Sequence, residues 1–498
     1  MVNNLDNSKE QPVPQLGKEL KPRHFFSLAF GCIIGVGWIL VLGEWLDQAG
    51  PLGALLAFGA GALVMMTVGL CYAELAAMLP ASGGEVAYTY EIFGIKSSYT
   101  IGWALALSYV SVTTFEAVSF GWITSTIFPA LKGVTLYTIR GEPVHLGSLL
   151  LALVGMVFLL YLNYRGLKSA AVFQEILTYG LLVLSLVFVS AGIIWGKPSN
   201  MEPLFSKAGT GPALWGTLAV FITTPFFLAG FNVIPQTMEE KSPGASTRKV
   251  VRMILLSIGV AACFYLLVIL SSSMVTPWKK LLPLELPAAG AFEVAFKSPL
   301  MAKIVLFAGL CGIVTTWNTV FISSSRIIFA LGRAHIIPST FGRVHPVHGS
   351  PSITVIFVGI IATMGVFLGR STIIPIVNVA GSCFALAFFF SCLGVIKLRR
   401  TRPQQHRPYR MPGGNIIAST GVVCSIGVLF LSFYQHYRNS EGEFPMEWIF
   451  ILVWILLGGV FWFMAKSLRA EVPESERRKL ILGTNVSLEN RVGDNNKE

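Results

Sequence analysis

The chain has 498 residues, of which 54% are hydrophobic and only 12% are charged. With a mean hydropathy of +0.67, it is too apolar for a soluble protein of this length, and we expect it to lie in a lipid bilayer. The formal net charge of +12 would suit a nucleic-acid partner, but the placement of the basic residues along the chain argues against one.

Twelve apolar runs are long enough to cross the hydrocarbon core, which needs roughly 20 helical residues. They predict an all-α integral membrane protein with twelve transmembrane helices. The first run is too long for a signal peptide and lacks a small-residue cleavage pattern, so we expect it to be retained. The runs cover residues 25–46, 52–79, 99–128, 147–164, 170–195, 213–238, 250–276, 299–331, 352–369, 373–396, 415–436 and 447–466.

The basic residues predict which side of the membrane each loop faces. If both termini lie in the cytoplasm, the inward segments hold 27 of the 37 lysine and arginine residues, as the positive-inside rule requires. The chain is therefore expected in the cell membrane with both termini cytoplasmic, and the basic run 397–410 is expected to contact anionic lipid. All seven cysteines fall within the apolar runs, so no outer loop is expected to carry a disulfide framework.

The first run is interrupted at Ile34-Gly35-Val36-Gly37, and the sixth is interrupted at Gly230-Phe231-Asn232, about 195 positions later. An interruption at bilayer depth survives only where it is buried in protein or lines a cavity. A matching pair in the two halves of a chain indicates a transporter's binding site. For the glycines of the first run alone, close helix packing is an equal alternative.

The positions of the two interruptions predict how the chain is organised. Each stands in the first helix of a set of five, which is the inverted-repeat arrangement. We expect a cytoplasmic tail over 1–22, a first repeat over 23–198, a second repeat over 199–398, a basic loop with two further helices over 399–466, and a cytoplasmic tail over 467–498. In the outer loop after the seventh run, residues 287–296 are expected to form a short surface helix.

Glu116 is a carboxylate well inside the third run. Acids at this depth are costly and face a cavity or the bundle interior, so Glu116 is a candidate proton carrier or counter-ion of an amine. A protonated Glu116 bonded to a neighbouring helix is the structural alternative. Glu175, nearer the inner end of the fifth run, is expected to pair with Arg165 or Lys168.

Four stretches resemble the amino acid-polyamine-organocation permeases. Residues 34–37 are similar to the I-G-x-G signature of that superfamily, and residues 72–85 are similar to YxELAxxxPxxGGxY. Asn318 with the stretch 325–338 resembles the eighth-helix motif N…SRxxYAxARDGxxP, and residues 407–412 resemble RPYxxP. The matches stand in the family's order and cover about residues 25–465.

The resemblance implies a leucine-transporter-like 5+5 inverted repeat with broken helices 1 and 6. It also implies that both breaks bind substrate, that Phe226 is a gating aromatic, and that Trp317 lines the pocket. Trp38 would cap the pocket or pack outside it. Ser323, Ser324 and Ser325 would offer hydroxyls to a sodium ion or bond between helices.

The chain departs from the family pattern in two places. Ala334-His335 replaces the usual Asp-Gly, which puts an inner-gate ion pair through that aspartate in doubt. The fifth run lacks the lysine that some proton-coupled members carry, because no lysine lies between Lys168 and Lys197.

The sequence thus predicts a secondary active permease for amino acids, working by proton symport or by exchange, with sodium coupling not excluded. An amine or polyamine transporter is the alternative, and a non-transporting membrane receptor of the same fold is a further one. No enzyme motif, cofactor site or metal site is indicated, and His345 with His348 lacks partners for a metal. The sequence identifies neither the transported molecule nor an oligomeric state.

Overall fold

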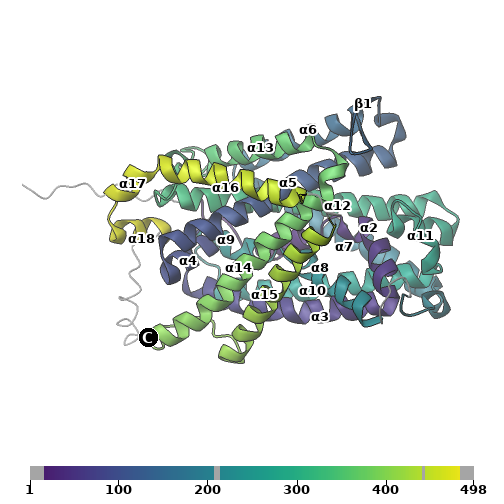
Figure 1. Cartoon of the computed structure of the whole chain (residues 1–498), viewed down its shortest axis with the longest axis horizontal. Coiled ribbons are helices and arrows are strands. Elements are labelled where there is room, and N and C mark those ends of the chain that lie inside the picture. The colour runs from purple at the N-terminus through teal and green to yellow at the C-terminus, as the bar shows by residue number, and fades with distance from the viewer. Residues whose placement is uncertain (1–15, 207–212, 440–443, 483–498) are drawn as a thin grey trace, which may run out of the picture.

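The structure is a computed structural model that describes residues 16–206, 213–439 and 444–482. Its helices run mostly along the long axis of an elongated bundle (Figure 1). Ten helices in the described part are long and apolar enough to cross a membrane. Two shorter apolar helices, α8 (Ala213–Phe227) and α13 (Ser352–Val366), stand where the sequence predicts the remaining two spans. The predicted all-α membrane class is confirmed, whereas the inverted repeat stays a prediction.

The first predicted span, 25–46, is divided among three helices. α1 (Pro22–Ile33) stops before the predicted break, and the short α2 (Gly37–Leu40) follows it. The next helix, α3 (Leu42–Met78), bends sharply at Gly50, whose φ of 72° lies in the region that favours glycine. Pro51 follows directly and removes one helical hydrogen bond, so the chain turns there before the second predicted span begins.

The sixth predicted span is broken in the same manner. α8 ends at Phe227, and one helical turn, α9 (Val233–Gln236), resumes beyond Gly230. The other helices are α4 (Glu85–Phe93), α5 (Ile95–Ile127), α6 (Leu146–Tyr164), α7 (Leu167–Trp195), α10 (Thr247–Val275), α11 (Pro287–Phe296), α12 (Pro299–Arg333), α14 (Ile373–Thr401), α15 (Gly414–Asn439), α16 (Met446–Met464), α17 (Lys466–Glu471) and α18 (Glu474–Leu482). α11 is the surface helix expected in the long outer loop.

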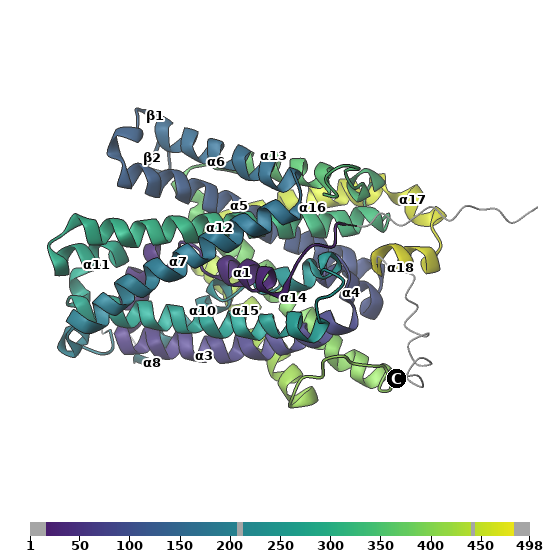
Figure 2. The ribbon, with the colours of Figure 1, turned by 180° about the vertical axis from the view of Figure 1, so that it is seen from behind.

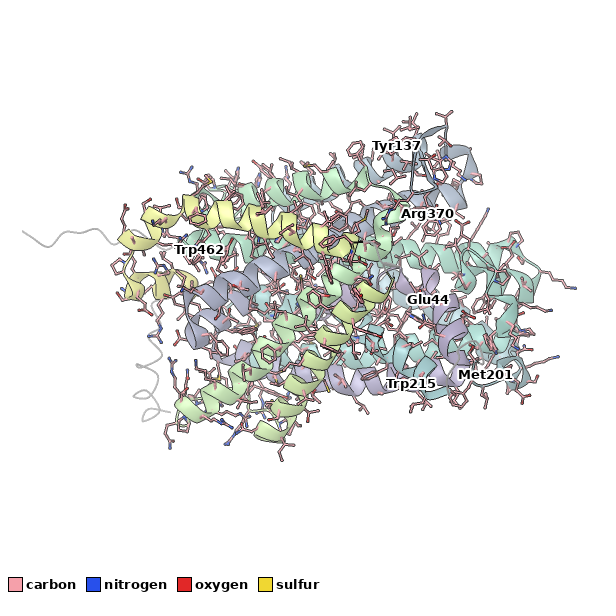
Figure 3. The ribbon with its side chains drawn as sticks, viewed as in Figure 1. Glu44, Tyr137, Met201, Trp215, Arg370 and Trp462 are labelled. Carbon is pink, nitrogen blue, oxygen red and sulfur yellow. The ribbon has the colours of Figure 1, made fainter. Side chains whose placement is uncertain are left out.

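A β-hairpin that the sequence analysis did not predict occupies the loop between α5 and α6. Its strands, β1 (Thr135–Ile139) and β2 (Glu142–His145), pair antiparallel. Arg140 and Gly141 form the two-residue turn with φ values of 51° and 84°, and two positive φ values are typical of the hairpin turn that matches strand twist. Tyr137 donates a hydrogen bond of 2.7 Å to the carbonyl oxygen of Phe367, which fastens the hairpin beside Arg370 (Figure 3).

Both described ends of the chain lie at one end of the bundle, which we call the tail end. There the N–H of Leu20 donates to the carbonyl of Glu240 at 3.0 Å, and Arg333 donates to the carbonyl of Ile481 in α18 at 3.3 Å. α4, α17 and α18 lie at this end, whereas β1 and α11 lie at the opposite end (Figure 1). The sequence predicts that the tail end faces the cytoplasm.

The broken helix α1 lies inside the bundle, where it packs against α7, α10 and α12 (Figure 2). Outer helices instead expose apolar side chains: Leu452, Ile455 and Leu456 on α16 are each more than half exposed. An apolar face of this kind is suited to lipid. The arrangement places the helix break in protein, where its freed backbone groups have polar neighbours.

Candidate functional site

The first break leaves backbone groups without helical partners. At the end of α1, Thr316 on α12 donates to the carbonyl of Gly31 at 2.9 Å, and Tyr265 on α10 donates to that of Ile33 at 3.2 Å. The N–H groups of residues 35, 36 and 37 donate to no acceptor among the residues that the structure describes. The break therefore presents three adjacent N–H donors, an arrangement that suits an anion such as a carboxylate.

The second break lies directly against the first. A Cβ atom on Gly230 would stand 2.9 Å from the backbone of Cys32 and Ile33, so only glycine permits this approach. Its φ of 124° also requires glycine. The carbonyl groups of Phe227 and Ala229 accept no hydrogen bond from the described part of the chain. Unpaired donors on one break thus lie near unpaired acceptors on the other.

A small cavity of about 40 Å³ lies between the two breaks in this conformation. Its walls are mainly apolar, and among the described residues Glu116, Tyr265 and Thr316 bring oxygen-bearing side chains to it. It is lined by Cys32, Ile33, Gly35, Val36, Gly37, Val112, Phe115, Glu116, Phe226, Phe227, Ala229, Gly230, Tyr265, Thr316, Val320 and Phe384. The arrangement suits a small molecule with a polar head and an apolar body.

Glu116 places its carboxyl group at the first break. A Cβ atom on Gly35 would stand 2.6 Å from Oε1 of Glu116, and only 2% of Glu116 is exposed. Its Oε2 atom is buried and has no hydrogen-bond partner among the described residues. A buried carboxyl group with an unpaired oxygen is costly unless it is protonated or pairs with a bound cation.

Comparison with known proteins identifies the family. A family model described as amino acid permease matches residues 20–459, which is most of the chain. The chain belongs to the amino acid permease family. The resemblance to the amino acid-polyamine-organocation superfamily that the sequence motifs indicated is thereby confirmed.

Individual relatives align with nearly the whole permease. The branched-chain amino acid permease BcaP of Bacillus subtilis is 26% identical over 468 residues, covering 90% of this chain and 93% of the relative. The methylthioribose transporter of the same organism is 25% identical over 466 residues, covering 92% of this chain and 95% of the relative. The human b(0,+)-type amino acid transporter 1 is 24% identical, covering 92% and 90%.

The permease brings most of the sequence-predicted site residues together. Residues 35–37, Phe226, Gly230 and Glu116 line the cavity, and Ile34 is buried beside them. Sequence analysis missed Tyr265, Thr316 and Phe384. Tyr265 carried the one available signal, a tyrosine in the middle of an apolar run, whereas Thr316 and Phe384 are ordinary residues of a membrane helix.

Phe231, Trp317 and Asn232 were also predicted to bind substrate, but they lie outside the cavity lining. Phe231 packs its ring against Tyr72 and Phe388. The ring of Trp317 packs against Phe120, with centroids 6.0 Å apart, and against the backbone of α6 at Gly155.

Asn232 turns toward the tail end, where its Nδ2 atom donates to Tyr109 and, at 3.4 Å, to Glu85. Its Oδ1 atom accepts from the N–H of Gly230 at 3.2 Å, so Asn232 also fixes the shape of the break.

The remaining candidates of the sequence analysis lie outside the cavity lining. Trp38 stacks on Phe188 with centroids 5.2 Å apart and thus packs outside the cavity. Ser324 and Ser325 donate to the carbonyls of Phe321 and Ile322 on their own helix. These hydroxyl groups therefore bond within α12, and Ser323 is fully buried beside them.

Glu175 pairs differently from the sequence prediction. It lies 3.3 Å from Arg23 and 3.4 Å from His24 of α1, and no ion pair joins it to Arg165 or Lys168 in the described part. The prediction from local spacing on α7 was wrong because the packing of α1 against α7 brings Arg23 close to Glu175.

The fifth span lacks the family's lysine, and next to Glu175 it brings neutral side chains to α1. Gln174 and Thr178 of α7 both donate to the carbonyl of Ser27, at 3.3 and 3.2 Å. Gln174 also accepts from Asn318 of α12 at 3.0 Å. Uncharged hydrogen bonds therefore hold α1 against α7 in addition to the Arg23–Glu175 ion pair.

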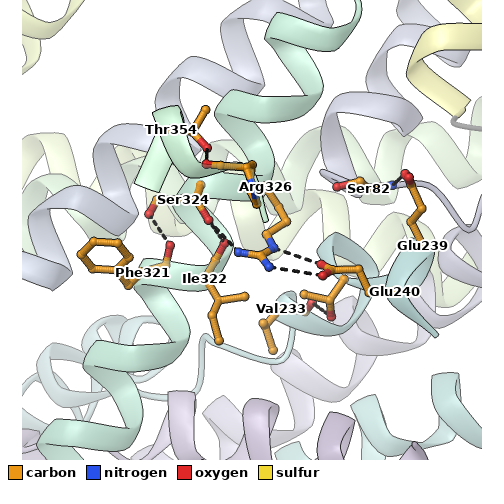
Figure 4. A network of polar contacts seen from close by, with 12 residues as sticks. Ser82, Val233, Glu239, Glu240, Phe321, Ile322, Ser324, Arg326 and Thr354 are labelled. Carbon is orange, nitrogen blue, oxygen red and sulfur yellow. Dashed lines mark hydrogen bonds and ion pairs between the residues drawn. The ribbon is translucent and has the colours of Figure 1, made fainter. Parts of the chain in front are cut away.

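Two buried ion pairs join α12 to the segment after α9 at the tail end, and Figure 4 shows the one between Arg326 and Glu240. Arg326 donates to both carboxylate oxygens of Glu240 at 3.0 and 3.2 Å. Arg333 donates to both oxygens of Glu239 at 2.7 and 2.8 Å. The sequence lacks the aspartate through which the family motif would form an inner-gate ion pair. In the structure, the acids that pair with the arginines of α12 are Glu239 and Glu240. The pairs hold the second break against α12 in this conformation.

Proposed function

We propose that this permease is a secondary active transporter that moves α-amino acids across the cell membrane by alternating access around the two helix breaks. The observation that carries the proposal is a set of three N–H groups, at residues 35–37, that have no acceptor among the described residues. These residues line the cavity, and so do Phe227 and Ala229, whose carbonyl groups accept no hydrogen bond from described residues. An α-amino acid offers a carboxylate to the first set and an ammonium to the second.

The cavity walls favour a neutral substrate with an apolar side chain. Val112, Phe115, Val320 and Phe384 supply apolar surface, and none of the described residues that line the cavity is basic. An acidic side chain would have no cation to pair with there. The name of the branched-chain permease agrees with this choice, but the methylthioribose transporter, at nearly equal identity, prevents an assignment from relatives alone.

An amine or polyamine substrate is the second candidate, and Glu116 is the observation that favours it. The unpaired Oε2 of Glu116 would bind a desolvated ammonium group. Such a substrate would leave the N–H groups of the first break unused. A receptor of the same fold would bind the same molecules without carrying them across.

Uptake into sealed proteoliposomes tests the proposal. A panel of labelled amino acids and amines is offered with an imposed pH gradient, a sodium gradient, or unlabelled substrate inside. We expect concentrative uptake of apolar amino acids in at least one arm. Binding to the purified protein without uptake in any arm would refute transport and favour a receptor.

Replacing Glu116 by glutamine separates its two candidate roles. Glutamine keeps the shape of the side chain but does not titrate. If Glu116 carries the coupling proton, accumulation driven by a pH gradient fails, while exchange of internal for external substrate persists. We expect this result, because the breaks already offer carbonyl groups to an α-ammonium. Glu175→Gln, which alters a carboxylate at the tail end, is the control, and we expect it to keep both activities.

If Glu116 is instead the counter-ion of a cationic substrate, both activities fall together. Unchanged accumulation and unchanged pH dependence in Glu116→Gln would show that the carboxyl group is structural.

A further inference from the structure

A second buried carboxyl group lies on the tail side of the cavity. Glu85 begins α4, just beyond the second long helix, and is fully buried. Gln236 of α9 donates to its Oε2 atom at 3.0 Å, and Asn232 donates to its Oε1 atom at 3.4 Å. Both amides also donate to the hydroxyl group of Tyr109 on α5. The carboxyl group is thus held by Asn232 of the second helix break and by Gln236 of the helix that follows it.

The groups around Glu85 leave its charge uncompensated. Three phenols face it, those of Tyr72 on α3, Tyr88 on its own helix and Tyr109 on α5. Among the described residues, the second break and α9 bring two neutral amides to Glu85, those of Asn232 and Gln236. The nearest acids along that segment, at positions 239 and 240, are already paired with arginines. None of the ion pairs between described residues includes Glu85.

Two opposed effects set the acidity of Glu85. Burial disfavours the charged form, whereas the hydrogen bonds donated by Gln236 and Asn232 favour it. Burial is the larger effect, and it raises the pKa of Glu85 to about 7. The group therefore changes charge near neutral pH.

Glu85 is separate from the cavity and from Glu116. It is not among the cavity-lining residues. Phe384 lines the cavity and packs edge-on against the ring of Tyr109, with centroids 5.3 Å apart. Tyr109 thus lies between the cavity wall and Glu85. A proton on Glu85 would exchange with solution at the tail end when α9 moves away from α4.

We propose that Glu85 is a proton-exchanging residue of the transport cycle, which holds a proton while α9 packs on α4 and releases it to tail-side water when that packing opens. This inference rests on the proposed function. Opening breaks the O–H bond of the carboxylic acid, water takes the proton, and the carboxylate remains hydrated. Because the packed state is the one with the raised pKa, protonation favours packing and deprotonation favours opening.

Thermal unfolding of the detergent-solubilised protein tests the inference independently of transport. The packed state binds a proton more tightly than the unfolded chain does, so the contribution of Glu85 to stability is complete at acid pH. That contribution falls as the pH rises from the ordinary value of 4.5 through about 7. Wild-type protein should lose melting temperature across this interval, and Glu85→Gln should lose much less.

Glu91→Gln is the matched control. Glu91 lies on the same helix but already pairs with Arg402 and Arg478, so its replacement should keep the wild-type dependence on pH. In proteoliposomes, Glu85→Gln should reduce accumulation driven by a pH gradient by about tenfold or more, because a proton-binding site is lost. Exchange of internal for external substrate, with the same pH on both sides of the membrane, should persist.

The inference would be overturned if the melting temperature and the accumulation of Glu85→Gln both depended on pH as those of the wild-type protein do. If Glu85→Gln does not fold, Gln236→Leu replaces it. Removing the amide that favours the carboxylate should raise the pKa of Glu85 further, so the fall in melting temperature should occur at higher pH than in the wild-type protein. An unchanged pH for this fall would overturn the inference. If wild-type protein moves no amino acid, the proposed function fails, while the melting curves still report whether Glu85 titrates.

Discussion

Replacing Gly37 or Gly35 by leucine is expected to reduce uptake to the level of protein-free liposomes, with the protein still folded and inserted. A Cβ atom on Gly37 would collide with the ring of Phe227, and one on Gly35 would stand 2.6 Å from Oε1 of Glu116. Even one added methylene in a packed site costs about 1–3 kcal/mol. A leucine adds four carbon atoms where the backbone of the break meets the cavity.

Gly59→Leu is the matched control for these variants. Gly59 lies within α3, and a Cβ atom there would have no heavy atom within 4 Å among its described neighbours. We expect near-normal uptake from Gly59→Leu. Uptake kinetics are to be measured together with the elution profile from size-exclusion chromatography, which reports folding. Normal kinetics in both Gly35→Leu and Gly37→Leu would remove the first break from the binding site.

Breaking the Arg326–Glu240 pair is expected to cause the largest loss of stability. Both side chains are 1% exposed, so Arg326→Met leaves a buried carboxylate without its cation. Removing one partner of such a pair costs about 3–5 kcal/mol. Burial already raises the pKa of Glu240 in spite of Arg326, which indicates how strongly this carboxylate depends on the guanidinium group. The melting temperature in detergent measures the effect.

The double variant Arg326→Met with Glu240→Gln separates pairing from packing. With both charges absent, no buried ion is left unpaired, so the double variant should be more stable than Arg326→Met alone. Effects that simply add would contradict a direct coupling between the two side chains. Arg370→Met is the matched control, since its pair with Glu285 is solvent-exposed and should contribute little.

The fold could be predicted from sequence wherever one strong local signal governs it. Hydropathy placed the long helices, and glycines at 35, 37 and 230 marked the breaks, because a helix in lipid tolerates an interruption only for a structural reason. The hairpin over 135–145 was missed, because a short polar loop of an apolar chain carries little pattern. Its Arg140-Gly141 turn is a weak signal.

The site was less predictable because its contacts join residues far apart in the chain. Glu116 and the breaks were found because a buried acid and a broken helix are unusual in any membrane protein. Asn232 was expected in the pocket but bonds to Glu85, which is 147 positions away. Local spacing predicted that Glu175 pairs with Arg165 or Lys168, whereas helix packing brings it to Arg23. Sequence reveals which groups need a partner, and the tertiary structure determines which partner they have.

Competition between an amino acid and its decarboxylated amine tests the central claim most directly. The claim is that the N–H groups of residues 35–37 bind the carboxylate of the substrate. Uptake of labelled leucine is measured in proteoliposomes with excess unlabelled leucine or excess of the amine that lacks only the carboxylate. We predict that leucine competes fully and that the amine competes weakly. Equal competition by the two would contradict the claim and favour an amine transporter that relies on Glu116.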